Sequence, residues 1–80
     1  MTTIIGISVS NRKETATKVQ EILTEFGCDI KTRLGLNDYN ENSCTYNGLI
    51  LIDMPKREKA IEMINELKAI ENVTVKEMEF

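Results

Sequence analysis

Histidine and tryptophan are both absent from this chain of 80 residues, and proline occurs only once. Without histidine, a chain cannot form a histidine-based catalytic triad, and it loses the usual ligand of zinc, copper and nickel sites. The two cysteines, Cys28 and Cys44, lie far apart in the sequence and form no CxxC pair. The sequence therefore predicts no catalytic residue, no metal site and no cofactor, and we expect that the protein is not an enzyme.

Long apolar runs and an excess of positive charge are also lacking. No apolar run reaches the roughly 18 residues that a membrane-spanning helix needs. The 13 acidic side chains outnumber the 10 basic ones, which gives a net charge of −3 and argues against direct nucleic-acid binding. The first residues carry no basic segment typical of a signal peptide. We expect a cytoplasmic protein with reduced thiols and no membrane partner.

The residues that are present alternate between two periodicities, in the order β-α-β-β-α-β. Residues 3–9, 28–36, 46–53 and 73–80 are rich in β-branched and apolar side chains, which predicts four strands. Helical spacing of apolar residues predicts one helix in each of the two crossovers. The first follows a cap at Ser10 or Asn11 and runs to Phe26, where Gly27 is expected to stop it in the left-handed conformation. The second follows a cap at Asp53 or Met54 and ends near Glu71 or Asn72.

The alternation also predicts which side chains form the core. Ile5, Ile7 and Val9 share one face of the first strand, and Ile4, Gly6 and Ser8 share the other. In the second strand we expect the apolar set that includes Cys28 and Leu34 to face the helices, and Arg33 to point away from them. The helices are expected to contribute Ala16, Val19, Ile22, Leu23 and Phe26, and then Ala60, Ile61, Met63, Ile64 and Leu67.

This element order is that of a split β-α-β pair, an α+β architecture. Right-handed crossovers place the first and third strands at the centre and both helices on one face of the sheet. The third strand has four consecutive aliphatic residues, 49–52, so it presents apolar side chains on both faces. Because two helices cover only one face, we expect a second copy of the chain to cover the other, as a homodimer or a larger homo-oligomer.

The end of the second strand is the candidate site for a small anionic ligand. Arg33 offers a planar fork of donors that suits a carboxylate or phosphate. Gly35 has no Cβ, so a ligand can approach the backbone closely. Asn37 begins the polar stretch 37–45, which contains Tyr39, and this stretch is expected to act as a lid over the site. We predict ligand contacts from Arg33, Gly35, Asn37 and Tyr39.

The segments 4–9, 11–14, 19–26 and 30–36 resemble the small proteins assigned as regulators of the iron-only hydrogenase system. The most specific pieces are Arg33-x-Gly35 and the helix start Arg12-Lys13-Glu14. The resemblance implies an ACT-like, ferredoxin-like βαββαβ sandwich, with a four-stranded antiparallel sheet and two helices on one face. This fold is similar to the C-terminal sensor of the nickel-responsive repressor. The resemblance further implies that residues 1–80 are a single ACT-like regulatory domain with a ligand-sensing role and self-association.

Some properties of related proteins do not transfer to this chain. The nickel site is not carried over, because every histidine it needs is missing. No segment has the pattern of a helix-turn-helix or DNA-reading ribbon, so an effect on transcription would require a regulatory protein partner. Two alternatives stay open: a protein-interaction module without a ligand, and an acylphosphatase-like enzyme. The second would use Arg12 and Asn47, but the glycine-rich loop around its arginine is missing.

Overall fold

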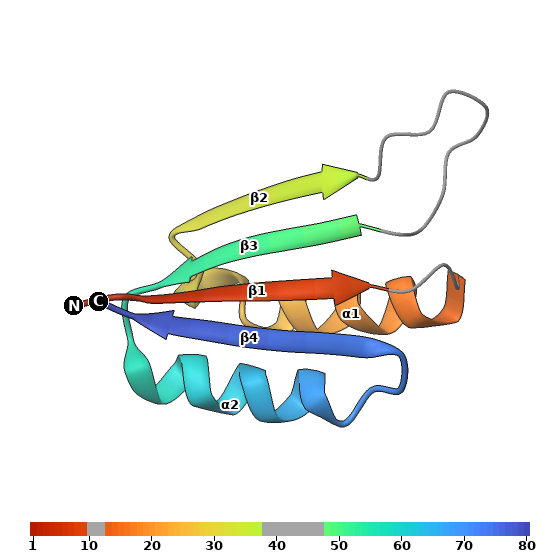
Figure 1. The fold of residues 1–80 in the computed structure, drawn as a ribbon. Coiled ribbons are helices and arrows are strands. Elements are labelled where there is room, and N and C mark those ends of the chain that lie inside the picture. The colour runs from red at the N-terminus through yellow and green to blue at the C-terminus, as the bar shows by residue number, and fades with distance from the viewer. Residues whose placement is uncertain (10–12, 38–47) are drawn as a thin grey trace.

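The structure, a computed structural model, describes residues 1–9, 13–37 and 48–80. Within these ranges the chain folds into one four-stranded sheet and two α-helices (Figure 1). Along the chain lie β1 (Thr3–Val9), α1 (Lys13–Glu25), a 3₁₀ turn η1 (Gly27–Asp29), β2 (Thr32–Asn37), β3 (Gly48–Met54), α2 (Arg57–Lys68) and β4 (Val73–Glu79). The predicted order of strands and helices is confirmed.

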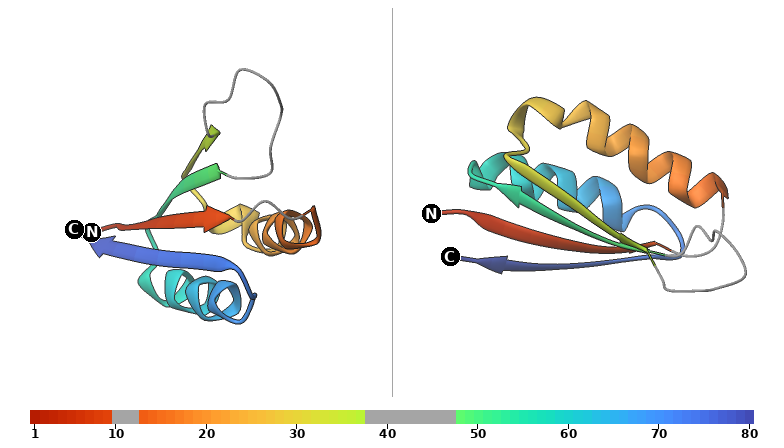
Figure 2. Two further views of the ribbon diagram at one scale, coloured as in Figure 1. Left: turned by 45° about the vertical axis from the view of Figure 1, so that its right-hand side comes forward. Right: turned by 90° about the horizontal axis from the view of Figure 1, so that it is seen from above.

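The sheet has the strand order β2-β3-β1-β4, and every neighbouring pair is antiparallel. Both helices lie on the same face of this sheet (Figure 2). The central position of β1 and β3 is the one that right-handed crossovers predict. The architecture is therefore an α+β, ferredoxin-like sandwich, as the sequence predicted. The two ends of the chain meet at one end of the sheet, where the backbone of Thr2 and Phe80 exchanges two hydrogen bonds of 3.1 and 2.8 Å.

The core lies between the sheet and the helices and is built on alternate residues of β1. Ile5, Ile7 and Val9 are buried, as their shared face predicted. On β3 their neighbours include Ile50 and Ile52, which point to the same side. The apolar faces of the helices close this layer with the buried residues Val19, Leu23, Phe26, Ala60, Met63, Ile64 and Leu67. Ile61 was expected inside, but it is 43% exposed on the outer side of α2.

The second strand begins later than the sequence predicted. Residues 27–29 form the turn η1 instead of extended backbone, and the N–H of Asp29 donates to the carbonyl of Phe26 at 2.9 Å. None of the described glycines has a positive φ, so the expected left-handed Gly27 is wrong. Cys28 is exposed on this turn and does not belong to the core. A turn does not alternate its side chains as a strand does, and this is why the predicted inward position of Cys28 fails.

The start of α2 is held by an ion-pair cluster and not by the cap that the sequence suggested. The residue before the helix is Lys56, whose side chain makes no capping bond, and Asp53 belongs to β3. Arg57 Nη1 lies 2.6 Å from Glu77 Oε1, and Arg57 Nε lies 3.0 Å from Glu79 Oε2. Both carboxylates are on β4, so this arginine ties the first turn of α2 to the edge of the sheet.

Candidate functional site

The predicted ligand residues lie along β2, at the edge of the sheet. Arg33, Gly35 and Asn37 occupy alternate positions of this strand, opposite Ile52, Ile50 and Gly48 of β3. Gly35 has no heavy atom within 4 Å of the place where a Cβ would stand, so its backbone is open to approach. Tyr39 lies outside the described residues, as do Cys44 and the acylphosphatase candidates Arg12 and Asn47. The structure thus brings three of the four predicted residues onto one strand.

The side chain of Arg33 points to the face of the sheet opposite to the one predicted. Its neighbour on β3 is Ile52, which is buried beneath the helices, so Arg33 lies on the helix-covered side. Its Nη2 donates a hydrogen bond to Oε1 of Gln20 on α1. No pattern in the sequence points to this pair, because the two residues are on different elements. Gln20 accepts one of the five N–H donors of the guanidinium.

The two faces of β2 are exchanged relative to the prediction. Leu34 therefore lies on the face of the sheet that no helix covers. We call this face the open face. Its other apolar members are Ile4, which was predicted on this side, and Leu49, Leu51, Met78 and Phe80. Exposed fractions are 51% for Leu34, 40% for Leu49, 58% for Met78 and 67% for Phe80. Contiguous apolar surface of this kind is typical of an interaction site.

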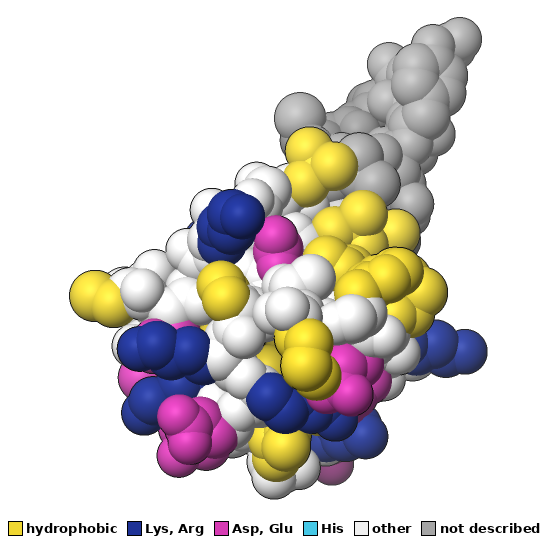
Figure 3. Space-filling model, turned by 90° about the vertical axis from the view of Figure 1, so that its left-hand side faces the viewer, with side chains coloured by type: hydrophobic (Ala, Val, Ile, Leu, Met, Phe, Trp, Pro, Cys, Tyr) yellow, Lys and Arg dark blue, Asp and Glu magenta, His cyan; other side chains and the backbone are white. Residues whose placement is uncertain are grey.

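These apolar side chains gather on one side of the molecule when it is viewed from the end where both termini lie (Figure 3). Gly6, at the centre of the sheet, has no side chain, so neighbouring apolar side chains can extend across β1. The Cβ that Gly6 lacks would stand 3.7 Å from Cδ2 of Leu51, so the leucine side chain lies over the glycine. The apolar side chains of the open face are therefore not interrupted at β1.

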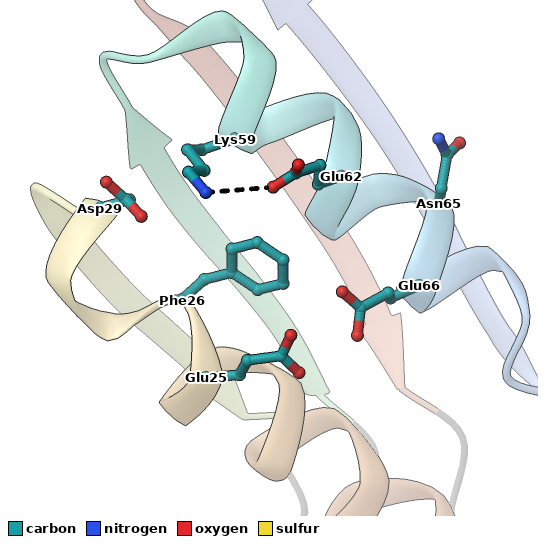
Figure 4. Close-up of a pocket in the computed structure, with 7 residues that line it drawn as sticks. All are labelled: Glu25, Phe26, Asp29, Lys59, Glu62, Asn65 and Glu66. Carbon is teal, nitrogen blue, oxygen red and sulfur yellow. Dashed lines mark ion pairs between the residues drawn. The ribbon is translucent and has the colours of Figure 1, made fainter.

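A shallow groove between α1 and α2 is the second candidate surface, because several charged side chains line it. Its lining residues are Glu25, Phe26, Asp29, Lys59, Glu62, Asn65 and Glu66. The ring of Phe26 lies between the helices, and the carboxylates of Glu25 and Glu66 approach each other across the gap (Figure 4). Lys59 Nζ pairs with Glu62 Oε2 at 3.4 Å along α2. Four of the seven side chains are carboxylates, so the groove is strongly acidic.

The environment in this groove raises the pKa of Glu66. Loss of water around its carboxyl is the first cause, followed by the charge of Glu25, a hydrogen bond with Glu25 and the charge of Glu62. An acid whose pKa is raised by folding binds its proton more tightly in the folded state. Its contribution to stability is therefore full below the unfolded pKa and is lost as the pH rises through the folded pKa. Because Glu66 is exposed, water screens this repulsion, so the ionised Glu66 should weaken the fold only modestly at neutral pH.

Glu66→Gln is thus expected to stabilise the protein at neutral pH. The amide keeps the shape and helix propensity of glutamate but carries no charge, so the repulsion from Glu25 and Glu62 disappears. Thermal unfolding midpoints of variant and native chain should differ at neutral pH and converge below about pH 4, where carboxyls are protonated. Glu21→Gln, at an exposed position of α1 outside the groove, is the control. A Glu66→Gln midpoint that tracks the native one at every pH would contradict the repulsion.

The remaining candidate features are a cysteine in a small hollow, possible metal ligands and possible membrane-spanning helices. Cys28 lies beside Lys31 and Lys56 in a small hollow near Pro55. Within residues 1–9, 13–37 and 48–80, no group of three or more His, Cys, Asp or Glu side chains is placed to hold a metal ion. In the same ranges, no helix combines the length and the apolar character needed to cross a membrane.

In a comparison with models of protein families, residues 1–77 match one family. The matching family is described as “TM1266-like: Iron-only hydrogenase system regulator, putative”. The comparison with curated proteins gave no match.

Several solved structures share the fold. A protein from Thermotoga maritima, TM1266, is 26% identical with a TM-score of 0.82, over 96% of this chain and 92% of that one. A dimeric ferredoxin-like protein of unknown function from Bacteroides fragilis is 10% identical with a TM-score of 0.56, over 99% and 96% of the two chains. A dimeric ferredoxin-like protein from Thermobifida fusca is 9% identical with a TM-score of 0.50, over 99% and 92%. The match to TM1266 extends over nearly the whole of both chains.

Proposed function

Because the chain belongs to the TM1266-like family, which is assigned to regulation of the iron-only hydrogenase system, we propose that it is a regulatory protein that works by self-association. The open face is the observation that carries this proposal. Two helices cover one side of the sheet, and the other side exposes large apolar residues, with Leu34 at 51% and Met78 at 58%. Burial of such surface against a second copy is favourable by about 25 cal/mol per Å² of apolar area. Residues 1–80 would act as one ACT-like regulatory domain.

Two further points support self-association and the absence of direct DNA contact. The ferredoxin-like proteins from Bacteroides fragilis and Thermobifida fusca, which share the fold, are both described as dimeric. The net charge of −3 opposes binding to a phosphate backbone. We therefore assign any effect on transcription to a protein partner of the regulator.

We assign the sensing role to the β2 edge. Arg33 lies on this edge strand with its side chain on the helix-covered side, so it borders the open face only at the edge of the sheet. The open backbone at Gly35, and Asn37 two residues further on, follow along the same strand. We propose that a small anionic metabolite binds Arg33 and the backbone near Gly35 and Asn37 at a boundary between copies, with Tyr39 as a further contact.

Light scattering over a dilution series tests the self-association directly. The native chain should give at least twice its chain mass of 9.1 kDa at micromolar concentration. Thermal unfolding in the presence of a panel of carboxylates and phosphates tests the sensing role, because a ligand that binds only the folded state raises the midpoint. If the chain associates but no compound raises the midpoint, the protein is an interaction module without a ligand. A mass of one chain at every concentration would overturn the proposal.

Arg33→Ala is expected to abolish most of the binding of any anion that the panel identifies. Loss of a buried charge pair costs roughly 2–5 kcal/mol of affinity. The fold should persist, because the side chain is exposed and its bond to Gln20 contributes no more than about 1 kcal/mol. Arg33→Lys is the matched control, since it keeps the charge but loses the planar fork, and it should bind with intermediate affinity. Titration calorimetry with unchanged affinity in Arg33→Ala would remove Arg33 from the site.

A further inference from the structure

The charged residues of the open face lie on opposite sides of its apolar surface. Among the described strand positions of this face, Asp53 of β3 and Lys76 of β4 are the charged ones; Thr32, Ser8 and Thr74 are polar but uncharged. When a sheet face carries one acidic and one basic residue, two copies packed face to face can form two ion pairs with each other. Whether it does depends on where the two charges stand relative to the apolar residues.

The strand register fixes that arrangement. The apolar residues form a diagonal stripe, which starts at Leu34 and Leu49, continues through Leu51 and Ile4, and ends at Met78 and Phe80. We call this the apolar stripe. Asp53 is the neighbour of Ile4 and Thr32, on the side of the stripe toward β2. Lys76 is the neighbour of Gly6, on the opposite side toward β4. The stripe therefore runs between the acid and the base.

Two copies can pack face to face about a two-fold axis that lies in the plane of contact and runs parallel to the apolar stripe. This rotation places the apolar stripe of one copy on that of the other. It also places the β2 side of each stripe against the β4 side of its partner. Lys76 of each copy then comes over Asp53 of the other, so the two ion pairs are reciprocal. An axis across the stripe also superposes the apolar residues, but it leaves each side in place and sets Lys76 against Lys76. Like charges set against each other in a contact are unfavourable, which selects the first axis. The strands of the two copies then cross at a steep angle, one of the two ways in which sheets pack face to face.

We propose that a second copy of this chain packs on the open face about the axis along the stripe, with reciprocal Asp53–Lys76 pairs. The inference rests on the self-association proposed above and adds its symmetry and its charged contacts. Asp53 already accepts a hydrogen bond from the hydroxyl of Thr2 in its own chain. A carboxylate has two oxygens and about four acceptor positions, so it can receive the lysine as well. The Thr2 bond holds the carboxylate in place for that contact.

Charge reversal provides a test that only this symmetry passes. Asp53→Lys alone sets lysine against Lys76, and Lys76→Glu alone sets glutamate against Asp53, so each variant should associate at least about tenfold more weakly than the native chain. In an equimolar mixture of the two variants, both contacts of a mixed dimer join opposite charges. We expect the mixture to form heterodimers with near-native affinity, measured by sedimentation with one variant fluorescently labelled.

Folding of the variants is checked separately, since Asp53 has a partner within its own chain. Circular dichroism must show the native signal for each variant alone. If Asp53→Lys does not fold, Thr32→Lys replaces it, because Thr32 is exposed and is the neighbour of Asp53 on the same face. Thr2→Val replaces the hydroxyl with a methyl group of similar size and should leave association within a few-fold of native.

The possible results separate this inference from the function it rests on. A native chain that associates, with folded variants that do not combine when mixed, overturns the proposed symmetry and leaves self-association standing. Single variants that associate as well as the native chain would likewise overturn the symmetry alone. A native chain that is monomeric at all concentrations overturns both, and assigns the open face to a different partner.

Discussion

A Leu34→Lys substitution is expected to convert the self-associated protein into a folded monomer. Leu34 is already 51% exposed within one chain, so the change costs the isolated fold little. Within the apolar contact, however, a lysine at this end of the stripe has no acidic partner and would have to lose much of its water, at a cost of several kcal/mol. The dissociation constant should rise at least about a hundredfold, since each 1.4 kcal/mol is a factor of ten. Light scattering at the concentration that gives a native dimer should report the mass of one chain.

Ile61→Lys is the matched control for this substitution. Ile61 is a large aliphatic residue with a similar exposed fraction of 43%, but it lies on α2, on the other side of the molecule. General effects of an added lysine on solubility or stability are shared by both variants. Only the position on the open face differs between them. An Ile61→Lys protein that dissociates while Leu34→Lys does not would move the interface to the helices.

The sequence predicted the central part of the fold well because its signals there are local. The strand bounds of β1 agree with the prediction, and alternation separated the buried Ile5 and Ile7 from Ile4 on the opposite face. The order of elements and the right-handed crossovers then left one arrangement of the four strands. None of these steps needed information about contacts between distant residues.

The orientation of β2 was predicted wrongly for a physical reason. Alternation shows that a strand has two faces, but it does not show which one the helices cover when both sheet faces are apolar. The leucines of β2 were expected in the core, yet Leu34 is on the open face with Leu51, and Arg33 contacts α1 through Gln20. The turn at residues 27–29 sets this orientation before β2 begins. Apolar alternation that points outward is itself a sign of a partner on that face.

The sequence predicted the candidate site as Arg33 and Gly35 at the end of the second strand, together with Asn37 and Tyr39 in the polar stretch that follows. Arg33, Gly35 and Asn37 are indeed together on β2, but the partner Gln20 comes from a helix thirteen residues earlier in the chain. The roles now given to Asp53 and Lys76 depend on strand register across three strands, which no spacing in the sequence reveals. From the sequence alone, Asp53 is a candidate only for a helix cap.

Leu67→Ala is expected to produce the largest loss of stability. Leu67 is fully buried and contributes to the core from α2. Removal of a buried leucine side chain typically costs about 2–5 kcal/mol, through lost burial and the cavity that remains. A domain of this size has roughly 4–12 kcal/mol in total, at 0.05–0.15 kcal/mol per residue. Urea unfolding should therefore show a large fall in the midpoint, whereas Ile61→Ala at the exposed side of the same helix should cost less than about 1 kcal/mol.

The same variant reports on association, because self-association stabilises only the folded chain. When the isolated fold is weakened, association supplies a larger share of the remaining stability, and the unfolding midpoint should rise with protein concentration. The native chain and Leu67→Ala should both show this rise. Adding Leu34→Lys to Leu67→Ala should remove the dependence on concentration and lower the midpoint further. A midpoint of Leu67→Ala that stays constant over a hundredfold range of concentration would mean that the folded chain does not associate.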